Sequence, residues 1–135
     1  MADTLIDHVD IRVSDLAASL AFYQAALAPL GSAPEPEEQD PAGGREIGFK
    51  HGSRMTFAIH TVAPEPGQDT VTTGAHIAFT AESQEAVQAF HAAAVAHGGT
   101  SIGDPGLRPE YSAAYYGAFV LDPDGNNIEA TTRAS

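Results

Sequence analysis

The pattern of apolar and polar residues changes its period early in the chain. Residues 9–13 alternate between apolar and polar side chains and are rich in branched residues, which predicts a strand. After Ser14 and Asp15, either of which can cap a helix, apolar residues recur at helical spacing. The pattern therefore predicts a helix with one apolar face, formed by Leu16, Leu20, Tyr23 and Leu27.

The same succession of patterns occurs again in the second half of the chain. The segments that begin at His8 and His76 align without gaps, and alanine matches alone would mean little in such alanine-rich helices. The His, Phe and Gly matches lie at equivalent places and indicate a duplication. The matching pairs include His8/His76, Ala18/Ala86, Ala21/Ala89, Phe22/Phe90 and Gly31/Gly99.

The second copy predicts its own strand and helix. Residues 77–79 read as a strand, Ser83 can cap the helix, and Gly98 and Gly99 can end it. The apolar stripe of this helix is formed by Val87, Phe90 and Ala94.

Further strands are predicted after each helix. The first copy has apolar stretches at 46–49 and 55–59, and the second has them at 115–121 and 127–131. Turn residues separate them, at His51-Gly52-Ser53 and at Asp122-Pro123-Asp124-Gly125. Residues 32–44 are rich in Pro, Gly and acids, so we expect a mobile loop with at most a ragged edge strand.

Length and composition favour one soluble domain. The chain has 135 residues, which predicts a single domain over residues 1–135. No apolar run approaches the roughly 18 residues that suggest a membrane span. The N-terminus lacks the basic and apolar segments of a secretory signal, so we expect a cytoplasmic protein.

The charge and the absence of cysteine restrict the chemistry. A formal net charge of -12 argues against nucleic acid and against an anionic membrane surface, which leaves a small molecule or another protein as the partner. With no cysteine, disulfides, thiolate metal sites and cysteine nucleophiles are excluded. A metal ion would have to be bound by His, Asp or Glu.

Four local motifs, in this order and with this duplication, resemble the vicinal-oxygen-chelate superfamily, which includes glyoxalases, extradiol dioxygenases and bleomycin-resistance proteins. The motifs are Asp7-His8-Val9, residues 13–16 with Ser19 and Phe22-Tyr23, residues 74–79, and residues 122–129. The resemblance implies an α+β fold in which two tandem βαβββ modules form a curved mixed-sheet cup. The modules would cover residues 5–62 and 73–132, joined by a linker at 63–72.

The resemblance also implies a metal site. In metal-dependent members the ligands come from the first and last strands of each module. Those positions fall on His8 and His60 in the first copy and on His76 and Glu129 in the second, and the two intervals between copies are nearly equal. Imidazole and carboxylate ligands suit a divalent ion such as Fe, Ni, Zn or Mn. Glu129 could also act as the catalytic base, whereas His60 stands where glyoxalase-type members frequently have a carboxylate.

The segment before residue 115 offers candidates for substrate binding. Arg108 could meet an anionic group of a substrate, while Tyr111 or Tyr115 forms a wall of the pocket. The alternative is a surface loop in which Arg108 pairs with a nearby acid and the tyrosines lie half in the core. The remaining histidines, His51, His91 and His97, are predicted to have ordinary structural roles.

Three functions remain open at this point. We favour a metal-dependent lyase, isomerase or dioxygenase that chelates a small oxygenated substrate. The first alternative is a metal-free protein that sequesters an antibiotic or metabolite, similar to the bleomycin-resistance members. The second is a degenerate relative or partner subunit without a ligand. Family members of this size commonly form homodimers, so we expect a homodimer whose site lies within one chain or is shared by two.

Overall fold

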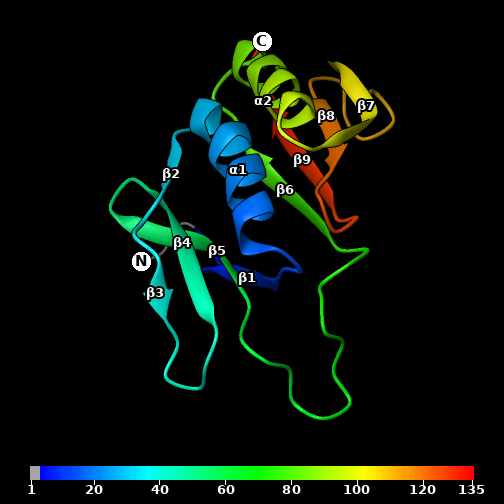
Figure 1. The fold of residues 1–135 in the computed structure, drawn as a ribbon. Coiled ribbons are helices and arrows are strands. Elements are labelled where there is room, and N and C mark those ends of the chain that lie inside the picture. Colours follow the sequence, from blue (N-terminus) through cyan, green and yellow to red (C-terminus); the bar gives the residue numbers. More distant parts are fainter. Residues whose placement is uncertain (1–3) are drawn as a thin grey trace.

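The computed structural model describes residues 4–135, which form two halves of the same design (Figure 1). Each half begins with a strand, continues through a helix and ends with the other strands of a mixed sheet. The first strand of each half pairs in parallel with the last, and the remaining pairs are antiparallel. The predicted α+β fold with two βαβββ-like modules is confirmed.

The first half forms a sheet with strand order β1-β5-β4-β2, and β3 also pairs with β4. The stretch expected to be a loop with a ragged edge strand contains both short strands, β2 and β3, at the edge of this sheet. The elements are β1 (Val9–Arg12), α1 (Leu16–Leu27), the 3-10 turn η1 (Ala28–Leu30), β2 (Ser32–Pro34), β3 (Glu38–Gln39), β4 (Arg45–His51) and β5 (Arg54–His60).

The second half forms a sheet with strand order β6-β9-β8-β7. The elements are β6 (His76–Thr80), α2 (Gln84–Ala96), β7 (Thr100–Leu107), β8 (Tyr116–Leu121) and β9 (Asn127–Thr132). Strand β7 was not among the predicted strands, because Gly103, Pro105 and Gly106 interrupt any apolar alternation. Its pairing with β8 has two register shifts, so the long-range ladder, and not the local sequence, holds this strand.

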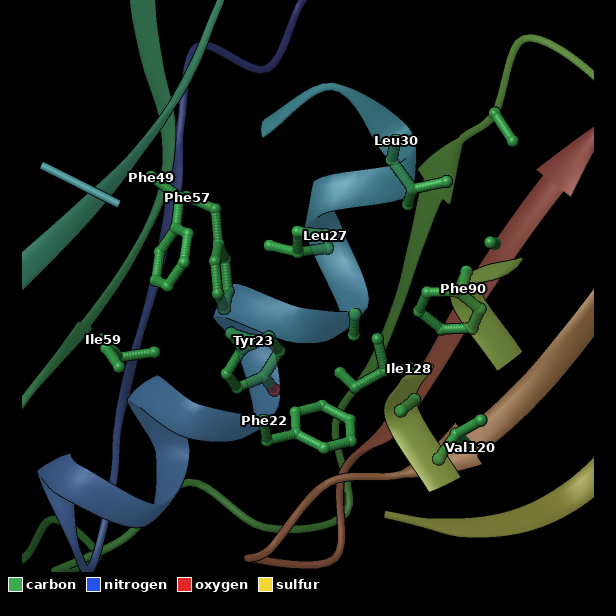
Figure 2. Close-up of a cluster of buried hydrophobic side chains, with 14 of the residues drawn as sticks. Phe22, Tyr23, Leu27, Leu30, Phe49, Phe57, Ile59, Phe90, Val120 and Ile128 are labelled. Atoms are coloured by element: carbon green, nitrogen blue, oxygen red, sulfur yellow. The ribbon is translucent and has the colours of Figure 1, made fainter. Parts of the chain in front are cut away.

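Helix α1 of the first half buries side chains both against its own sheet and against the second half (Figure 2). The Tyr23 ring packs against Phe57 of β5, with 4.9 Å between the ring centroids. Phe22 is fully buried and lies beside Val120 and Ile128 of the second sheet. The buried apolar residues of both halves therefore form one continuous core.

Both helices begin at the predicted caps. The Asp15 carboxylate accepts a hydrogen bond from the Ala18 N–H at 3.1 Å, and the Ser83 hydroxyl accepts one from Ala86 at 3.1 Å. Ser14, the other candidate for the first cap, instead donates its N–H to Asp124 at 3.1 Å. None of the helices among residues 4–135 is long and apolar enough to cross a membrane.

We expect Gly99→Ala to destabilise the protein more than Gly98→Ala, although the two residues are adjacent. Gly98 has a φ of 96° and open space around it, so alanine there costs about 1 kcal/mol of backbone strain. At Gly99 a Cβ would lie 2.6 Å from Val120 Cγ1 and 2.7 Å from Phe22 Cε1, inside the core. Overpacking of this kind costs about 2 to 3 kcal/mol. Equilibrium urea unfolding measures the free energy of unfolding of both variants. Equal decreases for Gly98→Ala and Gly99→Ala would contradict the packing argument.

Candidate functional site

Strand β9 carries a buried carboxylate on the face of the second sheet that points away from the core. Ile128 and Ala130 are fully buried in the core, so Glu129 between them points to the opposite face. Glu129 is nevertheless only 2% exposed. A buried carboxylate is costly unless hydrogen bonds compensate for its lost hydration, so the neighbours of Glu129 define a candidate site.

Two side chains contact the two oxygens of the Glu129 carboxylate. His76 Nε2 lies 2.9 Å from Glu129 Oε1, and the Tyr115 hydroxyl donates a hydrogen bond to Oε2. Burial and the bond to Glu129 raise the pKa of Tyr115 above its usual value, so Tyr115 stays a donor at neutral pH. His76 projects into solvent, so the pair lies at an accessible surface.

The topology explains why His76 and Glu129 meet. Strands β6 and β9 are parallel neighbours, with His76 opposite Asn127 and Ala78 opposite Glu129. His76 and Glu129 thus project from the same face of adjacent strands. Gly117 on β8 keeps this face open, since a Cβ there would lie 3.1 Å from Glu129 Oε2 and 3.4 Å from the Tyr115 ring.

Aromatic rings and guanidinium groups surround the pair. The Phe119 ring lies 6.1 Å from the His76 ring, and the Arg108 guanidinium lies 5.3 Å from the centroid of Phe119. On the other side, the Tyr115 ring has Tyr111 against its edge at 5.0 Å and Arg133 over its face at 4.9 Å. The three predicted substrate-binding residues therefore lie on this face. Tyr115 contacts Glu129, Tyr111 packs on Tyr115, and Arg108 lies over Phe119, which pairs with Glu129 across the strands.

The two histidines predicted in the first half lie elsewhere. His8 precedes β1, where its Nδ1 is 2.8 Å from Asp7 Oδ1, and this hydrogen bond is the main cause of a lowered pKa of Asp7. His60, at the end of β5, is 9% exposed. Its Nε2 is 3.4 Å from Asp10 Oδ1, and its Nδ1 accepts from the Val62 N–H at 3.2 Å.

The strand register corrects one step of the sequence argument. Glu129 pairs with the residue two positions after His76, and the residue two positions after His8 is Asp10, which pairs with Ala58. Ala58 therefore occupies the place in the first half that Glu129 occupies in the second, and His60 lies two residues further along β5. Nearly equal intervals in the sequence did not correspond to equivalent positions in the two sheets, because loop lengths and buried faces set the strand register.

The donors fit half of a divalent-metal site. Ligand atoms bound at about 2.1 Å to one ion lie about 3 Å apart when they are neighbours, close to the spacing of His76 Nε2 and Glu129 Oε1. One imidazole and one carboxylate also suit Fe, Ni, Zn or Mn. Within residues 4–135, however, no group of three or more His, Asp or Glu side chains is placed to hold an ion.

Sequence reasoning missed two residues of this face. Phe119 was predicted only to be part of a strand, and Arg133 lay beyond the last predicted strand. The alternation along β9 would have placed Arg133, because residues 129, 131 and 133 share one face of an extended chain. Phe119 pairs with Glu129 across β8 and β9, which only the register reveals.

Known proteins are similar to this chain in both sequence and fold. A family model described as the Glyoxalase/Bleomycin resistance protein/Dioxygenase superfamily matches residues 5–130. A solved glyoxalase/bleomycin resistance protein from Albidiferax ferrireducens T118 is 35% identical, with a TM-score of 0.76 over 95% of this chain and 98% of that chain. No match was found among curated proteins.

More distant structures share the fold alone. A glyoxalase/bleomycin resistance protein/dioxygenase family enzyme from Burkholderia phytofirmans PsJN is 22% identical, with a TM-score of 0.65 over 93% of this chain and 95% of that chain. Glyoxalase I from Zea mays is 20% identical, with a TM-score of 0.70, and this chain covers 45% of its length while 94% of this chain is matched. From the family match and the shared architecture, the chain belongs to the glyoxalase/bleomycin resistance protein/dioxygenase superfamily.

Proposed function

We propose that this protein is a divalent-metal-dependent enzyme, a lyase, isomerase or dioxygenase that chelates neighbouring oxygens of a small substrate. The observation that carries the proposal is the buried Glu129 carboxylate, held between the His76 imidazole and the Tyr115 hydroxyl at an accessible face. His76, which contacts this carboxylate, is half exposed to solvent. Convergent polar groups framed by aromatic rings are typical of a small-molecule site.

His76 and Glu129 are the proposed ligands from the second half, and Tyr115 has a positioning role. Its hydroxyl donates a hydrogen bond to Glu129 Oε2. The other carboxylate oxygen, Oε1, faces His76 and is available to bind an ion. A bound divalent ion would supply a Lewis acid that stabilises negative charge developing on the substrate oxygens. Glu129 is also the proposed base, through Oε1 when this oxygen is not bound to an ion.

The remaining ligands, His8 and His60, would come from a second copy of the chain. His8 stands at the end of an uncovered apolar segment, in which Leu5 and Ile6 have relative exposures of 102% and 64%. Exposed apolar side chains beside a candidate ligand support burial of this segment against a homodimer partner. His60 is the weaker candidate, because Asp10 and Val62 already occupy its two ring nitrogens.

Metal content tests this proposal. Protein purified without chelator is expected to hold a transition metal near one equivalent per chain, and His76→Ala and Glu129→Ala are expected to lose it. His97→Ala is the matched control, since this exposed histidine contacts the Ala93 carbonyl of α2 at 2.8 Å, and its loss should leave the metal content unchanged. Absence of metal after reconstitution with Fe, Ni, Zn and Mn would refute the proposed enzyme.

Mixing variants tests whether two chains share each site. His8→Ala removes a ligand of the first half, and Glu129→Ala removes a ligand of the second half. In a mixed dimer, one shared site therefore keeps both ligands and the other has lost both. With random pairing, refolding the two variants together should restore about a quarter of the wild-type metal content. Full loss in both variants with no recovery would argue that each site lies within one chain.

A metal-free binding protein is the second candidate, and one observation favours it. Ala58 stands where the duplication would place a second carboxylate, so the first half lacks the equivalent of Glu129. A binding protein of this kind needs an accessible aromatic face but no ion. Failure of metal reconstitution, together with unchanged folding of Glu129→Ala, is the outcome expected for this alternative.

A further inference from the structure

We propose that the face around His76 and Glu129 recognises a carboxylate carried by an aromatic or otherwise flat apolar molecule, and that Arg108 and Arg133, one on each side of this pair, attract the carboxylate. The inference rests on the proposed function, because it takes this face to be the substrate site. It adds the chemical class of the substrate and a role for Arg133.

The charge distribution sets these two arginines apart. The chain has 18 acidic residues and only six Lys and Arg residues. Arg45, Arg54 and Lys50 each lie within 4.0 Å of a carboxylate oxygen. In the part of the chain from residue 4 onward, Arg12, Arg108 and Arg133 have no such ion pair, and Arg12 lies on the first sheet, where it donates to the Val62 and Asp69 carbonyls. Two cations without carboxylate partners on one face of a strongly acidic protein provide a local site for an anion.

Arg108 is held in place with donors to spare. Its Nη2 donates to the Asp104 carbonyl at 2.6 Å and its Nη1 to the Leu107 carbonyl at 3.3 Å. A guanidinium has five N–H donors, so three remain for a ligand. Gly103 makes room for this placement, since a Cβ there would lie 2.8 Å from Phe119 and 3.3 Å from Arg108 Nη2.

Arg133 reaches the same face from the opposite side of Glu129. Residues 129, 131 and 133 alternate with the buried residues 130 and 132, so their side chains leave the sheet together. The Arg133 guanidinium lies over the Tyr115 ring, whose hydroxyl contacts Glu129. Each arginine is thus one aromatic ring away from the His76–Glu129 pair.

The surrounding groups favour a carboxylate on a flat apolar molecule. A planar guanidinium binds a carboxylate through two parallel hydrogen bonds. The rings of Phe119, Tyr111 and Tyr115 offer apolar surface beside both guanidinium groups. Phosphate sites commonly use a helix N-terminus, but the buried residues of α2, such as Val87 and Phe90, pack on the other face of this sheet.

The test compares a carboxylate with its neutral ester in metal-free protein. The full chain, treated with chelator, is titrated by calorimetry with 3,4-dihydroxybenzoate and with methyl 3,4-dihydroxybenzoate. We expect the acid to bind about tenfold or more tightly than the ester, because charge-assisted hydrogen bonds to guanidinium are lost in the ester. Arg108→Gln and Arg133→Gln should each reduce this ratio, and the double variant should abolish it.

Arg45→Gln is the matched control, because it removes the same charge from an arginine that pairs with Glu37 at 3.5 Å on the first sheet. The acid-to-ester ratio of this variant should equal that of wild type. Equal affinities for acid and ester in wild type, no binding of the acid at millimolar concentration, or an equal loss in Arg45→Gln would each overturn the inference. Since the titration needs no metal, its failure is distinct from failure of metal binding.

Discussion

Asp122→Ala is expected to lower the free energy of unfolding by about 4 kcal/mol, because it leaves several buried donors without an acceptor. The carboxylate is 5% exposed. Its Oδ1 accepts the backbone N–H groups of Asp124 and Asn126, both at 2.9 Å. Its Oδ2 accepts the Asn126 side-chain amide at 3.0 Å and the Tyr23 hydroxyl.

The expected loss is large because this carboxylate connects three parts of the chain. Tyr23 belongs to α1 of the first half, and burial together with Asp122 raises its pKa, so the hydroxyl remains a donor. Asn126 also donates to the Thr72 carbonyl at 2.9 Å and accepts the Ala75 N–H at 3.0 Å, which ties the segment before β6 to the turn. Loss of Asp122 therefore disturbs the junction of the two halves.

Two control variants separate this network from an ordinary surface contact. Tyr23→Phe removes a single buried donor and is expected to cost about 1 to 2 kcal/mol. Asp124→Ala removes an exposed contact with Ser14 and is expected to cost no more than about 1 kcal/mol. Equilibrium urea unfolding with fitted m values provides the comparison. A loss for Asp122→Ala no greater than that for Asp124→Ala would refute the argument.

Phe22→Ala is expected to cost about 3 to 5 kcal/mol, because it empties the contact between α1 and the second sheet. The ring is fully buried and packs edge-on against Tyr23, with 4.8 Å between centroids. Its Cε1 and Val120 Cγ1 both approach the position that a Cβ of Gly99 would occupy. Little space is available for neighbouring side chains to relax into the cavity.

The appropriate control is Leu20→Ala on the same helix. Leu20 is only partly buried at the edge of the core, so its loss is expected to cost about 1 to 2 kcal/mol. Thermal and urea unfolding of both variants, each with circular dichroism of the native state, measures the difference. Similar losses would indicate that Phe22 does not join the halves as proposed.

Local patterns predicted most of the fold for a clear physical reason. A strand with one buried face must alternate apolar and polar residues, and a helix packed on a sheet must repeat apolar residues at helical spacing. The caps Asp15 and Ser83 are local as well, since each bonds an N–H three residues away. Strand β7 was not predicted, because its sequence contains glycine and proline and only its pairing with β8 holds it as a strand.

The sequence likewise predicted only part of the candidate site. His76 and Glu129 were both predicted as ligands, and parallel pairing of β6 with β9 places them in contact. Their partners from the first half were chosen from sequence intervals, which carry no information on register. Only the ladder between β1 and β5 showed that Ala58 is the counterpart of Glu129.

The amino-acid sequence was enough to predict the duplicated modules, the Ser83 cap, the acidic charge and the candidate pair on β6 and β9, and it limited the first cap to Ser14 or Asp15. Three features became visible only in the folded structure: the contact of Tyr115 with Glu129, the position of Arg133 over the Tyr115 ring, and the packing of α1 against the second half. Periodicity and capping involve residues only a few positions apart in the chain, so the sequence reveals them. Register, burial on the outer face and ring contacts depend on strands that are distant in the chain.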